Sequence, residues 1–290
     1  ARLDSEKPIK PKKGLTYFLA LFCGLISPIA YISIKEFFSD TISSKSDLQD
    51  CTNIPILGLI GHSEKEKSLV VAIASKSIIA ESFRTLRTNI QYLSAHKDNK
   101  IITVTSTIGG EGKTFTAINL AGIFASSGHR TILIGGDLRK PKLHKDFNIN
   151  ETKGLSSYLI NKSSLKEVIE RTEIENLDVI GSGPTPPNPA ELLDSKNMKE
   201  LITELNKVYD YIIIDTPPVG LVTDGVILMR YADINLYVVR HNYTKRNMIG
   251  SVNNLFKQNH IKNLNIIIND FEHLKSLYGY GYGYGYGYGY

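Results

Sequence analysis

Cysteine is scarce in this sequence, and neither sign of charge is in strong excess. The only two cysteines, Cys23 and Cys51, are too few and too poorly placed for a disulfide framework, so we expect the folded part to lie in a reducing, cytoplasmic setting. A net charge of +5 is too weak to indicate nucleic acid as a partner. With 42% hydrophobic and 22% charged residues, the chain is not disordered.

Charge is absent from residues 14–34, a run of 21 residues. As a helix with a rise of about 1.5 Å per residue, this run would span about 30 Å, which matches the core of a bilayer. A buried helix of a soluble protein rarely stays uncharged on every face over such a length. We therefore predict a basic juxtamembrane segment at 1–13 and a transmembrane helix at 14–38, kinked by Pro28.

The sequence turns polar after this run, and we interpret residues 39–74 as a linker. Apolar residues at helical spacing then predict an amphipathic helix at 75–93. Short, β-branched apolar runs follow, and helix-length patterns separate most of them, which is typical of parallel strands buried on both faces. The predicted strands are 101–106, 131–135, 177–180, 211–215, 234–239 and 264–269. These patterns predict an α/β fold with a doubly wound, mainly parallel sheet in a domain at 75–277.

A glycine-rich loop follows the first predicted strand. Residues 107–114 match the phosphate-binding pattern G-x-x-x-x-G-K-[ST], except that Thr107 replaces the first glycine. Backbone N–H groups and the N-terminus of a helix at about 113–125 would bind a phosphate, Lys113 would neutralise it, and the Thr114 hydroxyl would bind Mg²⁺. We therefore predict a P-loop NTPase. The predicted nucleotide-binding residues are Gly109, Gly110, Glu111, Gly112, Lys113, Thr114, Phe115 and Asn269, although Asn269 is equally compatible with an ordinary strand end.

Tyrosine alternates with glycine over the segment 278–290. Glycine loses the most backbone entropy on ordering and has no side chain to bury, so we expect an exposed, mobile array of phenols. Low-complexity adhesive sequence and a tyrosine-rich strand stack are alternatives. The nucleotide loop upstream favours a phosphorylation cluster carried by its own enzyme. The predicted sites are Tyr278, Tyr280, Tyr282, Tyr284, Tyr286, Tyr288 and Tyr290.

Two aspartates follow predicted strands at the carboxyl edge, where ligands bind in open α/β folds. Asp215 ends an apolar strand and precedes Thr-Pro-Pro, which is typical of a carboxylate that holds Mg²⁺. A tyrosine hydroxyl has a pKa near 10, so transfer to it benefits from a side chain that takes or orients its proton. We predict Asp137 for that role, with a turn-capping aspartate as the alternative. The predicted catalytic residues are Lys113, Asp137 and Asp215, and the predicted metal-binding residues are Thr114, Asp137 and Asp215.

The basic residues before the apolar run predict a membrane topology that conflicts with a cytoplasmic location of the nucleotide-binding domain. By the positive-inside rule they would retain the N-terminus in the cytoplasm and place the later residues outside, where ATP is not available. The run is also too long for the apolar core of a signal peptide. We therefore expect the sequence to be the C-terminal part of a longer membrane protein in which an earlier span fixes the topology. The basic residues are Arg2, Lys7, Lys10, Lys12 and Lys13.

Over nearly its whole length the chain resembles the bacterial tyrosine kinases of capsule and exopolysaccharide machinery. The shared motifs are the GEGKT loop at 110–114, a second-strand motif similar to hydrophobic-D-x-D-x-R, IIIDTPP at 212–218, PNPAELL at 187–193, the tyrosine tail and a basic stretch before the last membrane helix. The resemblance implies a polysaccharide co-polymerase of the bacterial inner membrane. Its cytoplasmic domains would bind ATP and Mg²⁺, assemble as a homo-oligomeric ring and phosphorylate one another's tails. The implied partners are the lipid bilayer, the polymerase and export machinery, and a cognate tyrosine phosphatase, with no nucleic acid.

The helix at 75–93 carries Glu81, Arg84 and Arg87, which match the E-x-x-R-x-x-R self-association motif of these kinases. Residues spaced by three share one broad face of a helix, where they could pair with the acids of a neighbouring subunit. The alternative is an exposed ion pair between Glu81 and Arg84 within one helix.

One position departs from the kinase pattern, because Gly135 stands where the second-strand motif has its first aspartate. A weak kinase, or a scaffold that binds nucleotide without transferring phosphate, is therefore an alternative. A partition-type ATPase switch is another, but those proteins usually carry a second lysine early in the phosphate loop, and residues 107–111 contain none.

Overall fold

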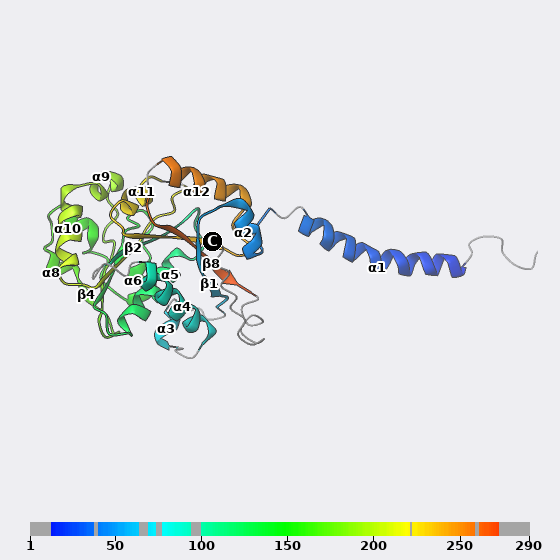
Figure 1. Ribbon diagram of the computed structural model, residues 1–290, viewed down its shortest axis with the longest axis horizontal. Helices are drawn as coiled ribbons and strands as arrows, with labels where there is room; N and C mark the ends of the chain where they lie inside the picture. The colour runs from blue at the N-terminus through cyan, green and yellow to red at the C-terminus, as the bar shows by residue number, and fades with distance from the viewer. Residues whose placement is uncertain are drawn as a thin grey trace, which may run out of the picture. The chain divides into compact units, whose positions relative to one another are not determined.

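The computed structural model describes residues 13–37, 40–63, 69–73, 77–93, 100–220, 222–258 and 261–272. The chain divides into two compact units, residues 1–40 and residues 41–290. The first unit contributes the helix α1, and the second contains the sheet and all the other helices that the structure describes (Figure 1). The predicted phosphorylation sites in the segment 278–290 lie outside the described residues.

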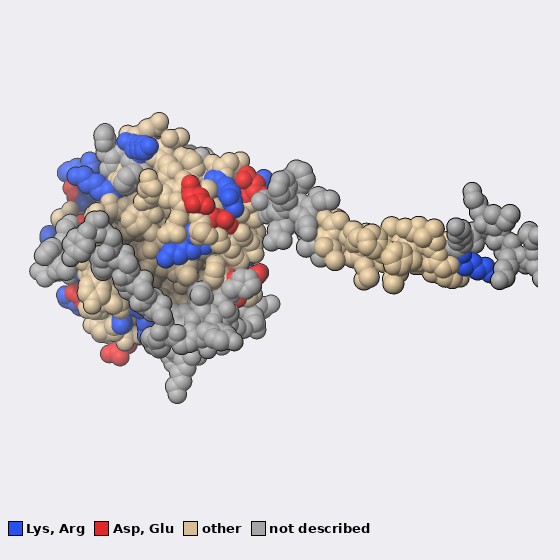
Figure 2. All heavy atoms as spheres, turned by 45° about the vertical axis from the view of Figure 1, so that its right-hand side comes forward, with Lys and Arg blue, Asp and Glu red and all other residues tan. Residues whose placement is uncertain are grey.

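The helix α1 (Lys13–Phe37) has 25 residues and contains Pro28. Its stretch Lys13–Tyr31 is long and apolar enough to cross a membrane, judged by length and composition. Figure 2 shows most of this helix as a surface without charged atoms. Helices that are apolar on every side are buried or span membranes, and none of this stretch is buried in the structure. A helix is therefore present where the span is predicted, and its crossing of a membrane stays a prediction. Most of the predicted basic segment before it lies outside the described residues.

The second unit is built on an eight-stranded sheet with the order β1-β8-β7-β2-β6-β3-β5-β4. Neighbouring strands of this sheet, as far as the structure describes it, pair in parallel, except for the antiparallel pair of β4 and β5. The strands are β1 (Ile56–Gly61), β2 (Lys100–Ser106), β3 (Thr131–Gly135), β4 (Glu170–Arg171), β5 (Leu177–Ile180), β6 (Tyr211–Asp215), β7 (Ile234–Arg240) and β8 (Leu264–Phe271). All the predicted strands are confirmed, and their apolar runs are buried on both faces of the sheet.

Alternate residues of each strand face opposite layers of helices. Ile102 and Ile213 pack with the helices on one face, and Ile101 and Ile212 pack with those on the other. The first layer comprises α3 (Val70–Ile73), α4 (Ile78–Leu93), α5 (Lys113–Ala125) and α6 (Leu143–Phe147). The second comprises α2 (Lys45–Cys51), α7 (Leu155–Leu159), α8 (Leu165–Val168), α9 (Pro189–Leu193), α10 (Lys196–Asn206), α11 (Asp224–Met229) and α12 (Arg246–Gln258). Figure 1 shows α11 and α12 on the opposite side of the sheet from α3 and α4, as a doubly wound fold requires.

The segment 39–74, predicted as a linker, differs from that expectation. It contains α2, the edge strand β1 and the short helix α3. Ile42 and Leu48 are fully buried and pack with α12 and β8 in one apolar cluster. Much of the expected linker is therefore a folded part of the second unit, which begins at Thr41.

Candidate active site

The phosphate loop connects β2 to α5 at the carboxyl edge of the sheet. Gly110 and Gly112 have φ angles of 89° and 94°, in the left-handed region that glycine adopts readily. Gly112 is also tightly packed, since a Cβ at this position would lie 2.0 Å from the Asn269 amide nitrogen. The helix α5 begins at Lys113, as predicted, so its free N–H groups are directed at the loop.

A buried carboxylate holds the loop from within. Glu111 is 1% exposed, and its Oε2 accepts a hydrogen bond of 2.8 Å from the Ile108 N–H, while its Oε1 accepts one from the Thr244 hydroxyl. Burial raises the pKa of Glu111, although the hydrogen bonds from Thr244 and Ile108 partly offset this effect. Glu111 therefore braces the loop, and its side chain does not face outward to a nucleotide.

Residues from the ends of β7 and β8 hold the outer carbonyls of the loop. Arg240 donates to the Gly110 carbonyl at 2.9 Å, and the Tyr243 hydroxyl donates to the Gly109 carbonyl at 3.0 Å. The amide of Asn269 donates to the Glu111 carbonyl at 3.0 Å. In this structure Asn269 thus contacts the phosphate loop, and its predicted contact with adenine stays a prediction. Arg240 and Tyr243 were not predicted from the sequence.

The three predicted catalytic side chains converge beside the loop. The Lys113 Nζ lies 3.2 Å from Asp137 Oδ2 and 3.7 Å from Asp215 Oδ1. The Thr114 hydroxyl donates to Asp215 Oδ2 at 2.7 Å. The register of the strands explains why these side chains lie close together. Asp215 on β6 pairs with Val104 on β2, the strand before the phosphate loop, and with Gly135 on β3, the strand before Asp137.

Charge at this centre is unbalanced, since two carboxylates share one ammonium group. Burial disfavours the charged form of Lys113, but the carboxylates of Asp215 and Asp137 outweigh it and raise the pKa of Lys113, which stays protonated. Burial raises the pKa of Asp215, and Lys113 offsets this only in part. Asp215 Oδ1 is buried without a hydrogen-bond partner among the described residues. An additional cation would relieve this excess of negative charge.

The residues present fit a magnesium ion. Mg²⁺ prefers oxygen ligands and is commonly held by one or two carboxylates together with substrate phosphates and water. The orphaned Asp215 Oδ1 and the Thr114 hydroxyl supply such oxygens next to the phosphate loop. Among the described residues, no group of three or more His, Cys, Asp or Glu side chains is placed to hold a metal without a substrate.

The backbone after β3 orients Asp137. Its Oδ1 accepts hydrogen bonds from the Arg139 N–H at 3.3 Å and the Lys140 N–H at 3.0 Å, which leaves Oδ2 for Lys113. The Arg139 side chain reaches across to Asp224, the first residue of α11, with Nε 2.7 Å from Oδ2 and Nη2 3.1 Å from Oδ1. Asp137 is therefore both a turn-capping residue and a partner of Lys113, so the two interpretations of the sequence are compatible.

Gly135, the departure from the kinase motif, is closely packed. The Ser182 hydroxyl donates to the Gly135 carbonyl at 2.9 Å. A Cβ at position 135 would lie 2.7 Å from Ser182 Oγ and 3.0 Å from the Ser182 backbone nitrogen. Ser182 thus occupies the space that the side chain of an aspartate would need.

Several other predicted residues lie away from this centre. Phe115 packs in the core with its ring 6.0 Å from that of Phe83, so its side chain faces α4. On α4, Arg84 pairs with Glu81 at 2.8 Å, and Arg87 donates to the Ser127 hydroxyl. In a single chain both arginines thus have intramolecular contacts, and their predicted role in self-association stays a prediction.

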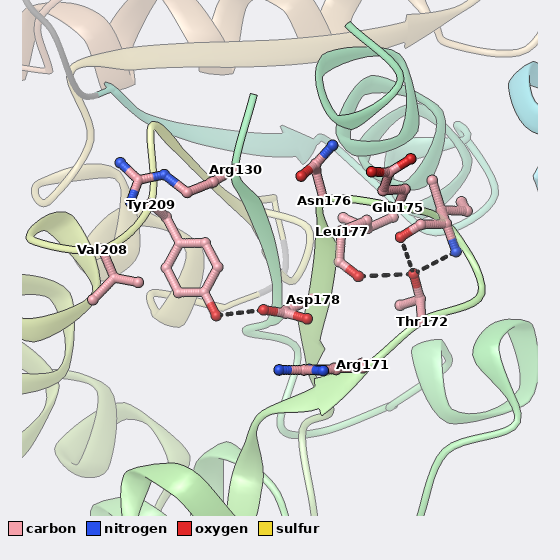
Figure 3. A pocket seen from close by; sticks show the side chains of 10 residues that line it. Arg130, Arg171, Thr172, Glu175, Asn176, Leu177, Asp178, Val208 and Tyr209 are labelled. Carbon is pink, nitrogen blue, oxygen red and sulfur yellow. Dashed lines mark hydrogen bonds between the residues drawn. The ribbon is translucent and has the colours of Figure 1, made fainter. Parts of the chain in front are cut away.

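A cavity of about 340 Å³ lies at the opposite, amino edge of the sheet (Figure 3). The Tyr209 hydroxyl donates a hydrogen bond to Asp178 at 2.7 Å on one side of the cavity. Burial raises the pKa of Tyr209, and the hydrogen bond to the Asp178 carboxylate raises it further. Arg130 lies on its rim and pairs with Asp210 at 2.9 Å. None of the predicted site residues within the described part of the chain lines this cavity.

Fold and site together define a P-loop NTPase of the doubly wound α/β class. In agreement with this class, the family model described as "AAA domain" matches residues 99–269. The kinase domain of the Escherichia coli tyrosine kinase ETK has a similar structure, with a TM-score of 0.74 and 27% identity over 86% of this chain and 100% of that domain.

Relatives in sequence identify the family. Tyrosine-protein kinase YwqD of Bacillus subtilis is 43% identical over 184 residues, which cover 63% of this chain and 78% of the relative. Tyrosine-protein kinase ptk of Acinetobacter johnsonii is 34% identical over 95% of this chain, but this chain spans only 39% of its length. The chain belongs to the bacterial tyrosine-protein kinase family.

Proposed function

We propose that the chain is a membrane-anchored, ATP-dependent protein-tyrosine autokinase. The observation that carries this proposal is the convergence of Lys113, Thr114, Asp137 and Asp215 beside the phosphate loop. The tail supplies an acceptor on the same chain, because the segment 278–290 contains seven tyrosines. Membership in the tyrosine-protein kinase family supports the proposal.

The chemistry follows from the positions of these side chains. The phenol oxygen of a tail tyrosine forms a bond to the γ-phosphorus of ATP, the bond from that phosphorus to the β-γ bridging oxygen breaks, and ADP leaves. Asp137 accepts or orients the phenol proton, and Lys113 stabilises the negative charge that develops on the phosphoryl oxygens. Thr114 and Asp215 would hold Mg²⁺, which neutralises charge on the β- and γ-phosphates when bound.

Assembly and location belong to the same proposal. The helix α1 would anchor the chain in the inner membrane, with the second unit and the tail in the cytoplasm. Subunits would form a ring in which Glu81, Arg84 and Arg87 exchange their intramolecular contacts for contacts with a neighbour, and each subunit would phosphorylate another's tail. Each phosphotyrosine adds about −1.5 to −2 charges, so repeated phosphorylation would repel subunits and favour disassembly.

The cycle of assembly would regulate polymerisation and export of a capsular or exopolysaccharide. In support of this, one relative is named as a putative tyrosine-protein kinase in the cps region of Klebsiella pneumoniae, with 32% identity over 82% of this chain. A cognate tyrosine phosphatase would return the tail to its unmodified state.

A nucleotide-gated scaffold without kinase activity is the second candidate, and Gly135 is the observation that favours it. The missing carboxylate leaves Asp137 as the one acid of the second-strand motif.

Mass spectrometry of the full chain after incubation with ATP and Mg²⁺ separates the two candidates. The autokinase predicts phosphate on tail peptides of the unaltered chain and none in Lys113→Met. Nucleotide binding by the unaltered chain without any gain in mass would contradict the autokinase and support the scaffold. A thermal melt of Lys113→Met controls for loss of folding.

A further inference from the structure

Asp224 is a fully buried carboxylate next to the candidate active site that no sequence motif above includes. Both of its oxygens accept hydrogen bonds from the Arg139 guanidinium, at 2.7 and 3.1 Å. Such two-point contacts fix orientation as well as distance. The pair joins the loop after β3 to the start of α11, two segments separated by 85 residues in sequence.

The loop that Arg139 anchors is the one that orients Asp137. The backbone N–H groups of Arg139 and Lys140 both donate to Asp137 Oδ1, and the other oxygen lies 3.2 Å from Lys113 Nζ. A change in the path of this loop would therefore turn the Asp137 carboxylate away from the lysine.

Close packing reinforces the same connection. A Cβ at Gly136 would lie 2.6 Å from Leu228 Cδ1, so the loop lies directly against α11, the helix that Asp224 begins. The orientation of Asp137 is especially important in this chain, because Gly135 replaces the first aspartate of the second-strand motif and the motif offers no other carboxylate.

We propose that Asp224 is a positioning residue, which through Arg139 holds the loop 136–140 so that Asp137 faces Lys113 and the incoming tyrosine hydroxyl. This inference rests on the proposed kinase activity. It adds to the site a residue that touches neither nucleotide nor tyrosine.

The variant that tests it is Asp224→Asn. We change Asp224 and not Arg139 because the residue that loses its partner should be able to reach water. The Arg139 side chain is 43% exposed, whereas that of Asp224 is 0% exposed. The freed guanidinium is solvated, so we expect the chain to fold. A displacement of about 1 Å can cost roughly 100-fold in rate, and we expect the kcat of tail phosphorylation to fall by about 10-fold to 100-fold. The KM for ATP and the Kd for ADP, measured by calorimetry with and without Mg²⁺, should change by less than about threefold, because the phosphate loop is untouched.

A second variant and a matched control complete the experiment. Arg139→Lys keeps the charge but loses the planar fork, and we expect it to lower kcat in the same way. Asp210→Asn breaks another two-point contact between an arginine and an aspartate, the pair with Arg130 at the amino edge of the sheet, which combines a side-chain contact of 2.9 Å with a backbone contact. We expect this control to keep both kcat and KM.

The outcomes are distinguishable. Unchanged kcat in Asp224→Asn, with tail phosphorylation intact in the unaltered chain, would overturn the inference alone. Equal losses in Asp224→Asn and Asp210→Asn that follow their melting temperatures would assign Asp224 a merely structural role and would also overturn it. Absence of phosphotyrosine in the unaltered chain would overturn the proposed function, and this inference with it.

Discussion

The two edges of the sheet carry similar residue types in opposite arrangements. At the amino edge, Arg130 and Asp210 form one complete pair, and their side chains are 61% and 27% exposed. At the carboxyl edge, Lys113 lies between Asp137 and Asp215, and all three side chains are at most 10% exposed. The first arrangement is balanced and hydrated, whereas the second is buried and has one negative charge too many.

The difference indicates that the charges at the carboxyl edge serve function at the expense of folding stability, whereas those at the amino edge do not. Burying charges without full compensation destabilises a fold, and perturbed ionisable groups gather at functional sites. The hydrated pair at the amino edge contributes little to stability and brings no special reactivity. Variants at each edge should therefore separate activity from stability.

Asp215→Asn should give the largest effect on activity. The amide carries no negative charge and replaces one carboxylate oxygen with an NH₂ group, so the magnesium site is weakened and tail phosphorylation should fall by about 100-fold or more. Quantitative phosphotyrosine detection at several Mg²⁺ concentrations measures this change. Activity equal to that of the unaltered chain would contradict the role of Asp215 in metal binding.

The same variant should fold at least as stably as the unaltered chain. Burial raises the pKa of Asp215, so its contribution to stability is lost as pH rises through its folded pKa. An amide does not ionise, and we expect a gain of about 1 kcal/mol in the free energy of unfolding at pH 8, measured by urea titration. A clear loss of stability would show that the pair with Lys113 outweighs the burial cost.

Gly135→Asp should have the next largest effect, on stability. The new Cβ would lie 2.7 Å from Ser182 Oγ, and overpacking of this kind costs about 1 to 3 kcal/mol. The double variant with Ser182→Gly removes the contact with the hydroxyl, although the contact of 3.0 Å with the backbone nitrogen stays, so we expect partial recovery in urea titration. If the double variant also phosphorylates its tail faster, the missing carboxylate limits the native rate.

Asp210→Asn should have the smallest effect, about 1 kcal/mol or less on stability. The hydrogen bond from Arg130 holds the pKa of Asp210 below its usual value of 3.8. A lowered folded pKa stabilises the chain above the unfolded value, and this contribution is lost as pH falls through the folded pKa. The melting temperatures of variant and unaltered chain should therefore differ at pH 7, and the gap should narrow progressively as the pH falls below 3.8. A gap that does not narrow on acidification below this pH would contradict the ionic origin of the effect.

The sheet was largely predictable because most of its strands are continuous apolar runs, such as 211–215. Such runs can be identified as strands without knowing which strand pairs with them. The strand β1 was not predictable, because its sequence, Ile-Leu-Gly-Leu-Ile-Gly, contains two glycines and follows a polar stretch. Its pairing with β8, more than 200 residues away, decides its conformation. Local propensity carries no information about such a contact.

The centre of the site was predictable for a related reason. Lys113 and Thr114 belong to a motif with fixed spacing, and parallel strands bring Asp137 and Asp215 to the same edge. The supporting residues lie far from their partners in sequence, with Arg240 and Thr244 separated from the loop by 130 and 133 residues. No pattern in the sequence indicates that Arg240 and Thr244 contact the phosphate loop.

Ile42 has a practical consequence for anyone who wishes to work with a soluble fragment. Its backbone N–H donates to the Thr244 carbonyl at 2.9 Å, and its side chain is fully buried. A truncation that starts at residue 75 would remove this anchor together with β1, and β8 would become an uncovered strand edge of the kind at which chains aggregate. A fragment suited to crystallisation or kinetics begins no later than Asp40.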